Sequence, residues 1–280
     1  MYNAAVKTRG HYTLKIVHDE EPINPREEWD NFGHMICWHS RYNLGDKHDY
    51  ENPNAFLSEI VWRSIPPQEI LDQVKDGKVT GMRMDYDDES RTWDLRIYDA
   101  QFKKWFTEFS YPSLDPHEIA PEILKNMGGP ELYGLAELKN LIMPLYLLDH
   151  SGLTISTNDF HDRWDSGQIG WIYTSHADIA KEYGDASPES AEKARRLLNA
   201  EVETYDCYLR GECYGFQLFM DGAEVDSCWG FLGRFDEAKE AIREYLPEDA
   251  VPLADEAGYG DDEPEYAPEA DAETDDEMEE

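Results

Sequence analysis

Alternating apolar and polar residues mark three consecutive stretches in the first half of the chain. These stretches are residues 79–85, 92–98 and 105–111. In the second of them, Trp93 and Leu95 alternate with Asp94. Side chains on a strand point alternately to its two faces, so this period of two predicts an antiparallel meander with one solvated face.

A helical period is clearest in residues 188–210, where apolar residues recur at spacings of three and four. The segment begins with a proline, and Gly211 suits the position just after a helix ends. Farther on, Asp221-Gly222 separates two apolar runs. This dipeptide tolerates the positive φ angles of a type I′ turn, so it predicts a tight hairpin.

A second hairpin is expected around Gly152, between strands at 145–148 and 153–157, with a third strand at 169–174. In this chain the expected strands are joined mainly by hairpins rather than by crossover helices. The pattern therefore predicts an α+β fold, with antiparallel sheets built as hairpins and a meander and packed with several helices.

Charge sets the C-terminal segment apart. The chain contains 61 Asp and Glu against 25 Lys and Arg, a net charge of −36. Residues 247–280 hold 16 of the acidic groups, no Lys or Arg, and few large apolar side chains. Such a composition predicts a disordered acidic tail. We expect the rest to form α+β regions at 1–140 and 141–246, either as separate domains or as one continuous domain.

Residues 1–246 still carry a net charge of −20. This charge repels nucleic acid phosphates and anionic lipid, and it favours a basic protein as partner. Acidity could instead serve only to maintain solubility at high salt. The apolar run Leu141–Leu148 is too short to span a bilayer, and the N-terminus lacks a signal-peptide core. We therefore expect a cytoplasmic protein without membrane contact, whose cysteines are free thiols.

Residues 31–48 contain the potential metal ligands of this chain. They are His34, Cys37, His39 and His48. Two or three imidazoles and a thiol can bind zinc tetrahedrally, but this spacing matches no standard finger. The simpler interpretation is a core segment whose aromatic residues pack and whose histidines form hydrogen bonds, so we expect no metal. Glycine-rich phosphate loops and the HExxH motif are also absent from the sequence, and we expect no cofactor.

Residues 145–173 contain the parts of a hydrolytic or metal-dependent site. The candidates are Asp149, His150, Ser151, His161 and Asp165. Adjacent residues on a strand face opposite ways, so the first three cannot form a triad among themselves. An active site would need a concave pocket where His150 meets His161 or Asp165. The alternative is structural, with Asp and Ser side chains stabilising turns.

Three segments together resemble a family of uncharacterised bacteriophage and mobile-element proteins. They read DNFGHMICWHSRYNLGDKH at Asp30–His48, LYLLDHSGLTIST…WDSGQIGWIY at Leu145–Tyr173, and EVETYDCYLRG…YGF…VDSCWGF at Glu201–Phe231. The resemblance implies an accessory gene product that works in the host cytoplasm. It implies no catalytic residues.

The functional hypothesis is therefore an interaction protein rather than an enzyme. Charge and resemblance favour an accessory factor that binds a basic site on a host or phage protein, either as a nucleic-acid mimic or as an anti-defence inhibitor. The alternative is a small hydrolase or metal-dependent enzyme that uses His150, His161 and Asp165.

Overall fold

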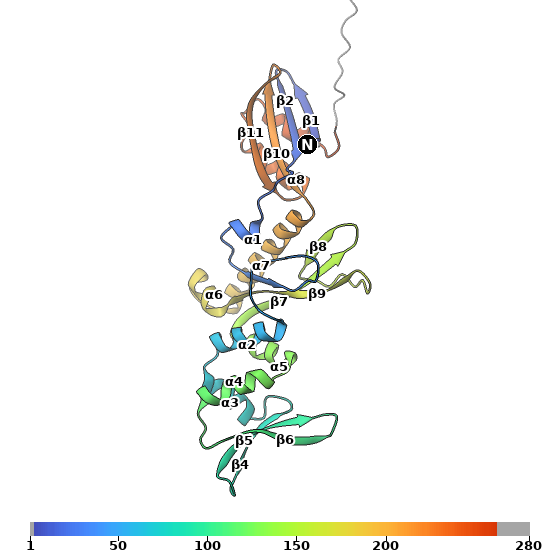
Figure 1. Cartoon of the computed structure of the whole chain (residues 1–280). Helices are drawn as coiled ribbons and strands as arrows, with labels where there is room; N and C mark the ends of the chain where they lie inside the picture. Colours follow the sequence, from blue (N-terminus) through green and yellow to red (C-terminus); the bar gives the residue numbers. More distant parts are fainter. Residues whose placement is uncertain (1–2, 262–280) are drawn as a thin grey trace, which may run out of the picture. The chain divides into compact units, whose positions relative to one another are not determined.

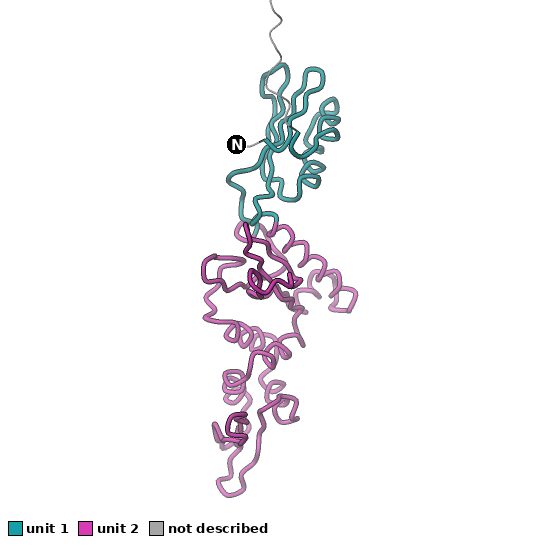
Figure 2. The backbone as a smooth tube through the Cα atoms, turned by 90° about the vertical axis from the view of Figure 1, so that its right-hand side faces the viewer, with its two compact units in different colours: residues 1–25, 207–280 teal, residues 26–206 magenta. Residues whose placement is uncertain are grey.

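The computed structural model describes residues 3–261 of the chain (Figure 1). They form an α+β fold of helices and antiparallel sheets, as the sequence predicts. The chain divides into two compact units, which Figure 2 distinguishes by colour. Unit 1 combines the residues up to Pro25 with those from Cys207 onward, and unit 2 is Arg26–Asp206. The expected regions 1–140 and 141–246, which the sequence allowed as two domains or as one, do not correspond to these units, because unit 2 continues through residue 140.

Unit 1 is an antiparallel sheet with strand order β1-β2-β10-β11 that packs against two helices. Its elements are β1 (Asn3–Arg9), β2 (Tyr12–His18), β10 (Cys213–Met220), β11 (Ala223–Leu232), α8 (Phe235–Arg243) and α9 (Val251–Glu256). Strands β2 and β10 pair from Tyr12 opposite Met220 to His18 opposite Tyr214. Because this pairing joins opposite ends of the chain, a boundary drawn by position along the sequence misses it.

The predicted tail boundary at residue 247 is wrong. Helix α9 lies beyond it, and its Leu253 and Ala254 side chains are fully buried in the core of unit 1. Backbone hydrogen bonds then join Gly260 to Ala4 and Val6 to Asp261, at the free side of β1. A few apolar residues are enough to dock this acidic segment on unit 1, because the sheet and helix α8 bury them. The remainder of the predicted tail, 262–280, lies outside the described residues.

The hairpin predicted at Asp221-Gly222 is confirmed. It joins β10 to β11, and its two central residues have φ angles of +50° and +84°. Both values lie in the left-handed region that a type I′ turn requires.

Unit 2 is built around a second antiparallel sheet with strand order β3-β9-β7-β8. Its strands are β3 (His34–Cys37), β7 (Asn140–Asp149), β8 (Leu153–Ser156) and β9 (Ser166–Ser175). The β7–β8 hairpin and the third strand β9 confirm the sequence prediction for this segment. The longest helix, α7 (Pro188–Leu209), also matches its prediction, and α1 (Pro25–Glu28) and α6 (His176–Tyr183) are shorter.

A three-stranded meander, also predicted, completes unit 2 and consists of β4 (Met82–Asp87), β5 (Thr92–Asp99) and β6 (Lys104–Tyr111). Helices α2 (Pro53–Ser64), α3 (Pro67–Lys75), α4 (Pro116–Asn126) and α5 (Gly129–Ala136) lie between the meander and the sheet (Figure 1). One apolar cluster runs from Ile142 on the sheet through Phe56 on α2 to Leu95 on the meander. Within residues 3–261, no helix has both the length and the apolar character needed to cross a membrane.

Candidate functional site

The four potential zinc ligands serve separate purposes in the structure. Burial raises the pKa of Cys37 to about 12, and the carbonyl oxygen of Cys37 accepts a hydrogen bond from Nε2 of His48 (2.9 Å). The ring centroid of His34 lies 5.3 Å from that of Tyr173, and His39 stacks on its neighbour Tyr42. In the part of the chain that the structure describes, no three His, Cys, Asp or Glu side chains come close enough to hold a metal ion.

The residues that organise this segment are instead Arg26 and its carboxylate partners. The side chain of Arg26 is 1% exposed. It donates to both carboxylate oxygens of Asp46 (2.8 and 3.1 Å), to Glu201 (3.0 Å) and to the carbonyl oxygen of Gly33 (2.7 Å). Glu201 also accepts hydrogen bonds from the backbone N–H groups of Phe32 and Gly33. This Arg26 cluster fixes the segment to helix α7, and its groups are occupied by one another.

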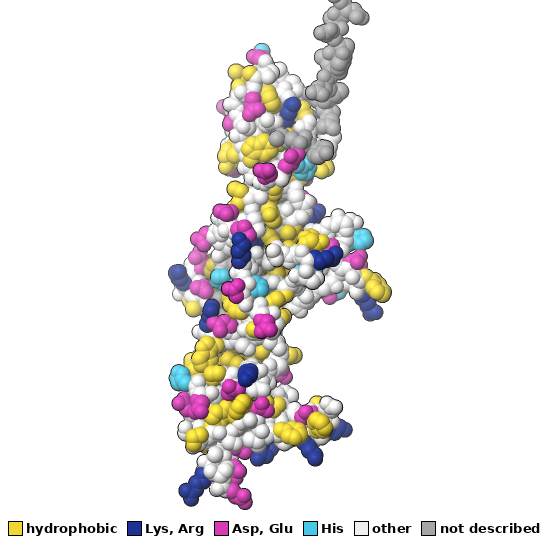
Figure 3. All heavy atoms as spheres, in the orientation of Figure 1, with side chains coloured by type: hydrophobic (Ala, Val, Ile, Leu, Met, Phe, Trp, Pro, Cys, Tyr) yellow, Lys and Arg dark blue, Asp and Glu magenta, His cyan; other side chains and the backbone are white. Residues whose placement is uncertain are grey.

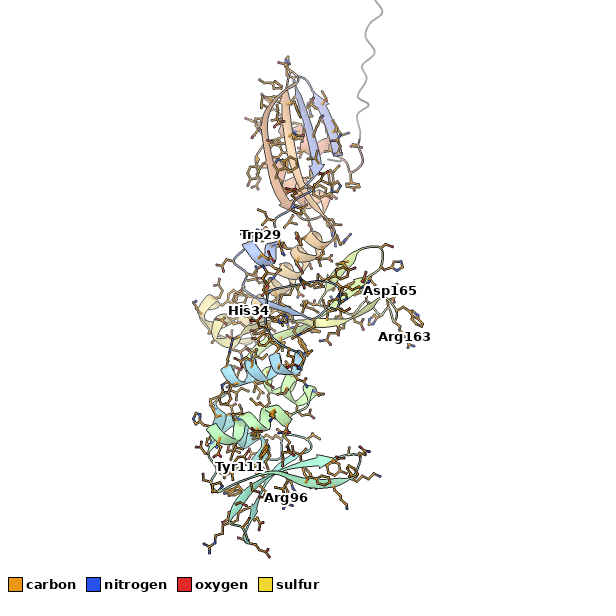
Figure 4. All side chains as sticks on the ribbon, in the orientation of Figure 1. Trp29, His34, Arg96, Tyr111, Arg163 and Asp165 are labelled. Atoms are coloured by element: carbon orange, nitrogen blue, oxygen red, sulfur yellow. The ribbon has the colours of Figure 1, made fainter. Side chains whose placement is uncertain are left out.

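A depression of about 460 Å³ lies beside the Arg26 cluster, where α6 and α7 face residues 30–34. Four carboxylates line it, from Asp30, Asp178, Glu182 and Glu201, together with one basic side chain, Lys181. His34, labelled in Figure 4, also lines it. The charge of this depression suits an ammonium or guanidinium group better than an anion.

The alternative catalytic residues lie at the end of the sheet where β7 turns into β8. His150 donates from Nδ1 to Asp165 (2.7 Å), so the structure does bring these two together. Asp149 pairs with Arg41, and His161 lies 3.4 Å from Asp159. Within the described residues, no hydrogen bond joins Ser151 or His161 to the His150–Asp165 pair.

The geometry of this pair differs from that of a catalytic dyad. The side chains of His150 and Asp165 are 70% and 40% exposed, so water surrounds the imidazole. Ser151 has a φ of +59° and forms the hairpin turn together with Gly152. Ser166 is used locally as well, because its hydroxyl donates to the carbonyl oxygen of Asp162 (2.6 Å). The pair therefore holds the start of β9 near the β7–β8 turn.

The β8–β9 loop, residues 157–165, is the feature of this region that sequence reasoning missed. Its residue Trp164 is 94% exposed, the highest value among the exposed large apolar side chains. Arg163, next to it, points away from the sheet (Figure 4). The only sequence signal was the Asp162-x-x-Asp165 spacing, which is typical of a turn whose backbone is capped by carboxylates. Two shallow depressions of about 280 and 450 Å³ flank the loop, one beside Trp164 and one beside Arg163.

No family model, curated protein or solved structure matches this chain. We therefore infer function from the geometry and charge of the described residues.

Proposed function

We propose that this protein acts by binding a basic surface of another protein. The observation that carries the proposal is an acidic excess that the chain does not neutralise itself. Residues 3–261 contain 50 of the acidic residues and all 25 basic ones. Most of these basic side chains already lie within 4.0 Å of a carboxylate, as in the pairs of Lys7, Arg63 and Lys139. The unpaired charge is therefore overwhelmingly negative.

The acidic side chains are spread over the face of each unit that Figure 3 shows. A field of one sign steers an oppositely charged protein towards the surface and raises its association rate. The same field opposes the approach of phosphates, so direct nucleic acid binding is disfavoured. The partner class that fits is a protein whose basic surface otherwise faces nucleic acid, which makes nucleic-acid mimicry the specific form of the proposal.

The acidic depression on unit 2 is part of this negatively charged surface. Phe32 and Leu197 lie among its carboxylates. An Arg or Lys side chain from a partner could place its alkyl stem against these apolar groups and its charge near Asp30 and Glu182. We assign the depression a contributing role, within a surface whose overall charge provides the attraction.

The hydrolase alternative is supported by one observation, the His150–Asp165 hydrogen bond. It is less well supported than the binding function, because the pair is exposed and no serine hydroxyl of residues 3–261 is bonded to it. An accessory role in a mobile element and an anti-defence activity follow from the sequence resemblance alone, and they remain part of the proposal on that basis.

The proposal is tested with an octa-arginine peptide and a duplex DNA as probes. The full chain and a chain ending at Asp261 are titrated with each probe by calorimetry, at salt concentrations between about 50 and about 200 mM. We expect both proteins to bind the peptide, with affinity that falls steeply as salt rises, and neither to bind the duplex. The end point at Asp261 matters because a chain ending at Leu246 would lose helix α9 and with it part of the core of unit 1.

Specific outcomes separate the proposal from a general salt adaptation. The protein is added to a basic DNA-binding domain already bound to its duplex, and release of the duplex is followed. Release by the chain ending at Asp261 supports mimicry, whereas failure to release it contradicts mimicry. Tight binding of the duplex by the protein itself would overturn the proposal. The depression is tested with Asp30→Asn/Glu182→Gln against Glu118→Gln/Glu203→Gln, which removes the same charge elsewhere on unit 2.

A further inference from the structure

Strand β6 forms one edge of the meander and is exposed along almost its whole length. Only its last residue, Tyr111, is buried, and the β5–β6 hairpin projects beyond helices α3 and α4 (Figure 1). Trp105 and Phe106, which point to opposite faces of the strand, are 37% and 48% exposed. Edge strands are normally protected from pairing by proline, by charge or by a covering segment. An aromatic edge strand without proline therefore has the features of a strand that pairs with another chain.

The hydrogen bonds of the meander show which backbone groups of β6 face outward. Tyr98 of β5 donates its N–H to the carbonyl oxygen of Gly81 (2.9 Å), on the β4 side. Because pairs in an antiparallel ladder alternate between bonded and non-bonded, Tyr98 and its partner Trp105 form a non-bonded pair. Trp105, and Thr107 two positions on, therefore direct their N–H and C=O groups to the free edge. Within residues 3–261, these groups have no hydrogen-bond partner.

The charge of the β5–β6 hairpin differs from that of the chain as a whole. Residues 92–111 contain three acidic and three basic residues, whereas the whole chain has a net charge of −36. A second copy of the chain can therefore approach this hairpin without strong local repulsion. Lys104 and Glu108 are both exposed on β6. Among the described residues, neither of them has an oppositely charged side chain within 4.0 Å.

We propose that β6 pairs antiparallel with β6 of a second copy of this chain, with Phe106 at the two-fold axis. In this register Trp105 lies opposite Thr107 of the partner subunit, so their outward N–H and C=O groups form four main-chain hydrogen bonds across the dimer. Lys104 lies opposite Glu108 of the partner subunit, and the two-fold symmetry provides this ion pair twice. The inference goes beyond the proposed function, because the partner is an identical acidic chain rather than a basic surface.

Charge selects this register among those that the main chain allows. Pairs centred on Trp105 or on Thr107 would also match the outward backbone groups. They would place Lys104 opposite Phe106 or Ser110 of the partner subunit, and its charge would stay unpaired. Opposite charges directly across two antiparallel strands stabilise the pairing, so the register centred on Phe106 is favoured.

Sedimentation equilibrium of the full chain tests the pairing, from micromolar to millimolar concentration and at about 50 and about 500 mM salt. We expect a monomer–dimer equilibrium whose dissociation constant falls as salt rises. Salt screens the repulsion between two chains of charge −36, whereas it leaves main-chain hydrogen bonds and aromatic contacts in place. Binding of a basic surface weakens under the same change, so this inference and the proposed function can fail independently.

Thr107→Pro tests the main-chain pairing. The proline removes an N–H that faces the free edge, so the ladder to β5 is kept, and the dimer should weaken at least about tenfold. Thr107→Ala is the matched control. Both variants lose the hydroxyl that donates to Asp94 (3.4 Å), but only the proline loses the N–H. Thr107→Ala should therefore keep the affinity within about twofold, and circular dichroism checks that both variants fold.

A charge exchange tests the register. Lys104→Glu places two carboxylates opposite each other and should weaken the dimer at least about tenfold. Lys193→Glu makes the same change of net charge on helix α7, away from the meander, and should have a much smaller effect (Figure 1). Adding Glu108→Lys to Lys104→Glu recreates the opposite pair and the original net charge, so it should restore the affinity.

Phe106→Cys gives a direct readout of the axis. Cα atoms of a non-hydrogen-bonded antiparallel pair lie about 4.5 Å apart, which is within the range of a disulfide. Mild oxidation should therefore link two Phe106→Cys chains. Tyr86→Cys, on the opposite edge strand β4, should stay monomeric under the same conditions.

The inference is overturned if the chain stays monomeric at all concentrations, or if the dimer weakens as salt rises. It is also overturned if Thr107→Pro and Thr107→Ala have equal effects, or if the charge exchange does not restore affinity. Linkage through Tyr86→Cys instead of Phe106→Cys would show that β4 is the paired edge, and the assignment to β6 would be wrong.

Discussion

The Arg26 cluster and the β8–β9 loop use similar residue types in opposite ways. Arg26 is buried and donates to two carboxylates and a carbonyl oxygen. Arg163 points away from the sheet, no carboxylate among residues 3–261 lies within 4.0 Å of its guanidinium, and its neighbour Trp164 is almost fully exposed. The Arg26 cluster holds the 31–48 segment in place, and the β8–β9 loop is part of the 145–173 segment; the sequence marked both segments as candidate chemistry. The contrast shows that the buried Arg26 joins segments that are distant in sequence, whereas the β8–β9 loop leaves its side chains exposed to solvent.

Substitutions in the Arg26 cluster and in the β8–β9 loop should differ most in how much they lower the free energy of unfolding. Replacing Arg26 with Met leaves Asp46 and Glu201 without their partner, and breaking a buried ion pair in this way costs about 3–5 kcal/mol. Arg63→Met is the control, because it removes an exposed pair with Glu59 worth about 0.5 kcal/mol. Urea unfolding followed by circular dichroism measures both. Equal losses for the two variants would show that the Arg26 cluster does not hold unit 2 together.

Two glycines of the same sheet sharpen the comparison. Strands β3 and β9 are paired neighbours in the sheet, with Cys37 opposite Gly170. A Cβ on Gly170 would lie 1.9 Å from the carbonyl oxygen of Ile36. Gly170→Ala should therefore cost about 2–3 kcal/mol through overpacking. At Gly152, in the outward hairpin, a Cβ meets nothing within 4 Å and only the φ of +158° opposes it, so Gly152→Ala should cost about 1 kcal/mol. Thermal and urea unfolding that reversed this order would contradict the assigned packing.

Local signals made much of the fold predictable. The meander follows from a period of two, helix α7 from apolar spacings of three and four, and the β10–β11 turn from Asp221-Gly222. Each of these depends on residues that are neighbours in sequence. The pairing of β2 with β10 and the docking of α9 depend on contacts between the two ends of the chain, which a single sequence does not show.

The candidate site was predictable to the same extent. His150 and Asp165 were identified as residues that could meet, and they lie 2.7 Å apart. Arg26 was missed because its partner Glu201 is 175 positions away. Trp164 was missed for a different reason, since an aromatic residue in a sequence is more often part of a core, and its exposure depends on how Asp162 caps the loop.

Variants of the outward loop should barely change global stability. Trp164→Ala removes a side chain with few contacts in the chain, so its free energy of unfolding should stay within about 0.5 kcal/mol of wild type. A change this small would show that Trp164 has no structural role in the folded chain. A loss comparable to that of Arg26→Met would show that Trp164 is buried in solution, and the comparison between the two regions would fail.

The smallest expected effect is the pH response of the loop. Hydrogen bonds from the N–H groups of Asp165 and Trp164 lower the pKa of Asp162 below its ordinary value of 3.8. A carboxyl whose pKa is depressed in the folded state contributes stability that is fully present above 3.8 and is lost as pH falls through the lower folded-state value. The amide chemical shifts of Trp164 and Asp165 should therefore change together, with a midpoint below 3.8. In Asp162→Asn the same two signals should show no such titration, since an amide does not ionise in this range. A midpoint above 3.8 in the wild type would mean that the carboxylate does not accept these hydrogen bonds and that the assigned conformation of the loop is wrong.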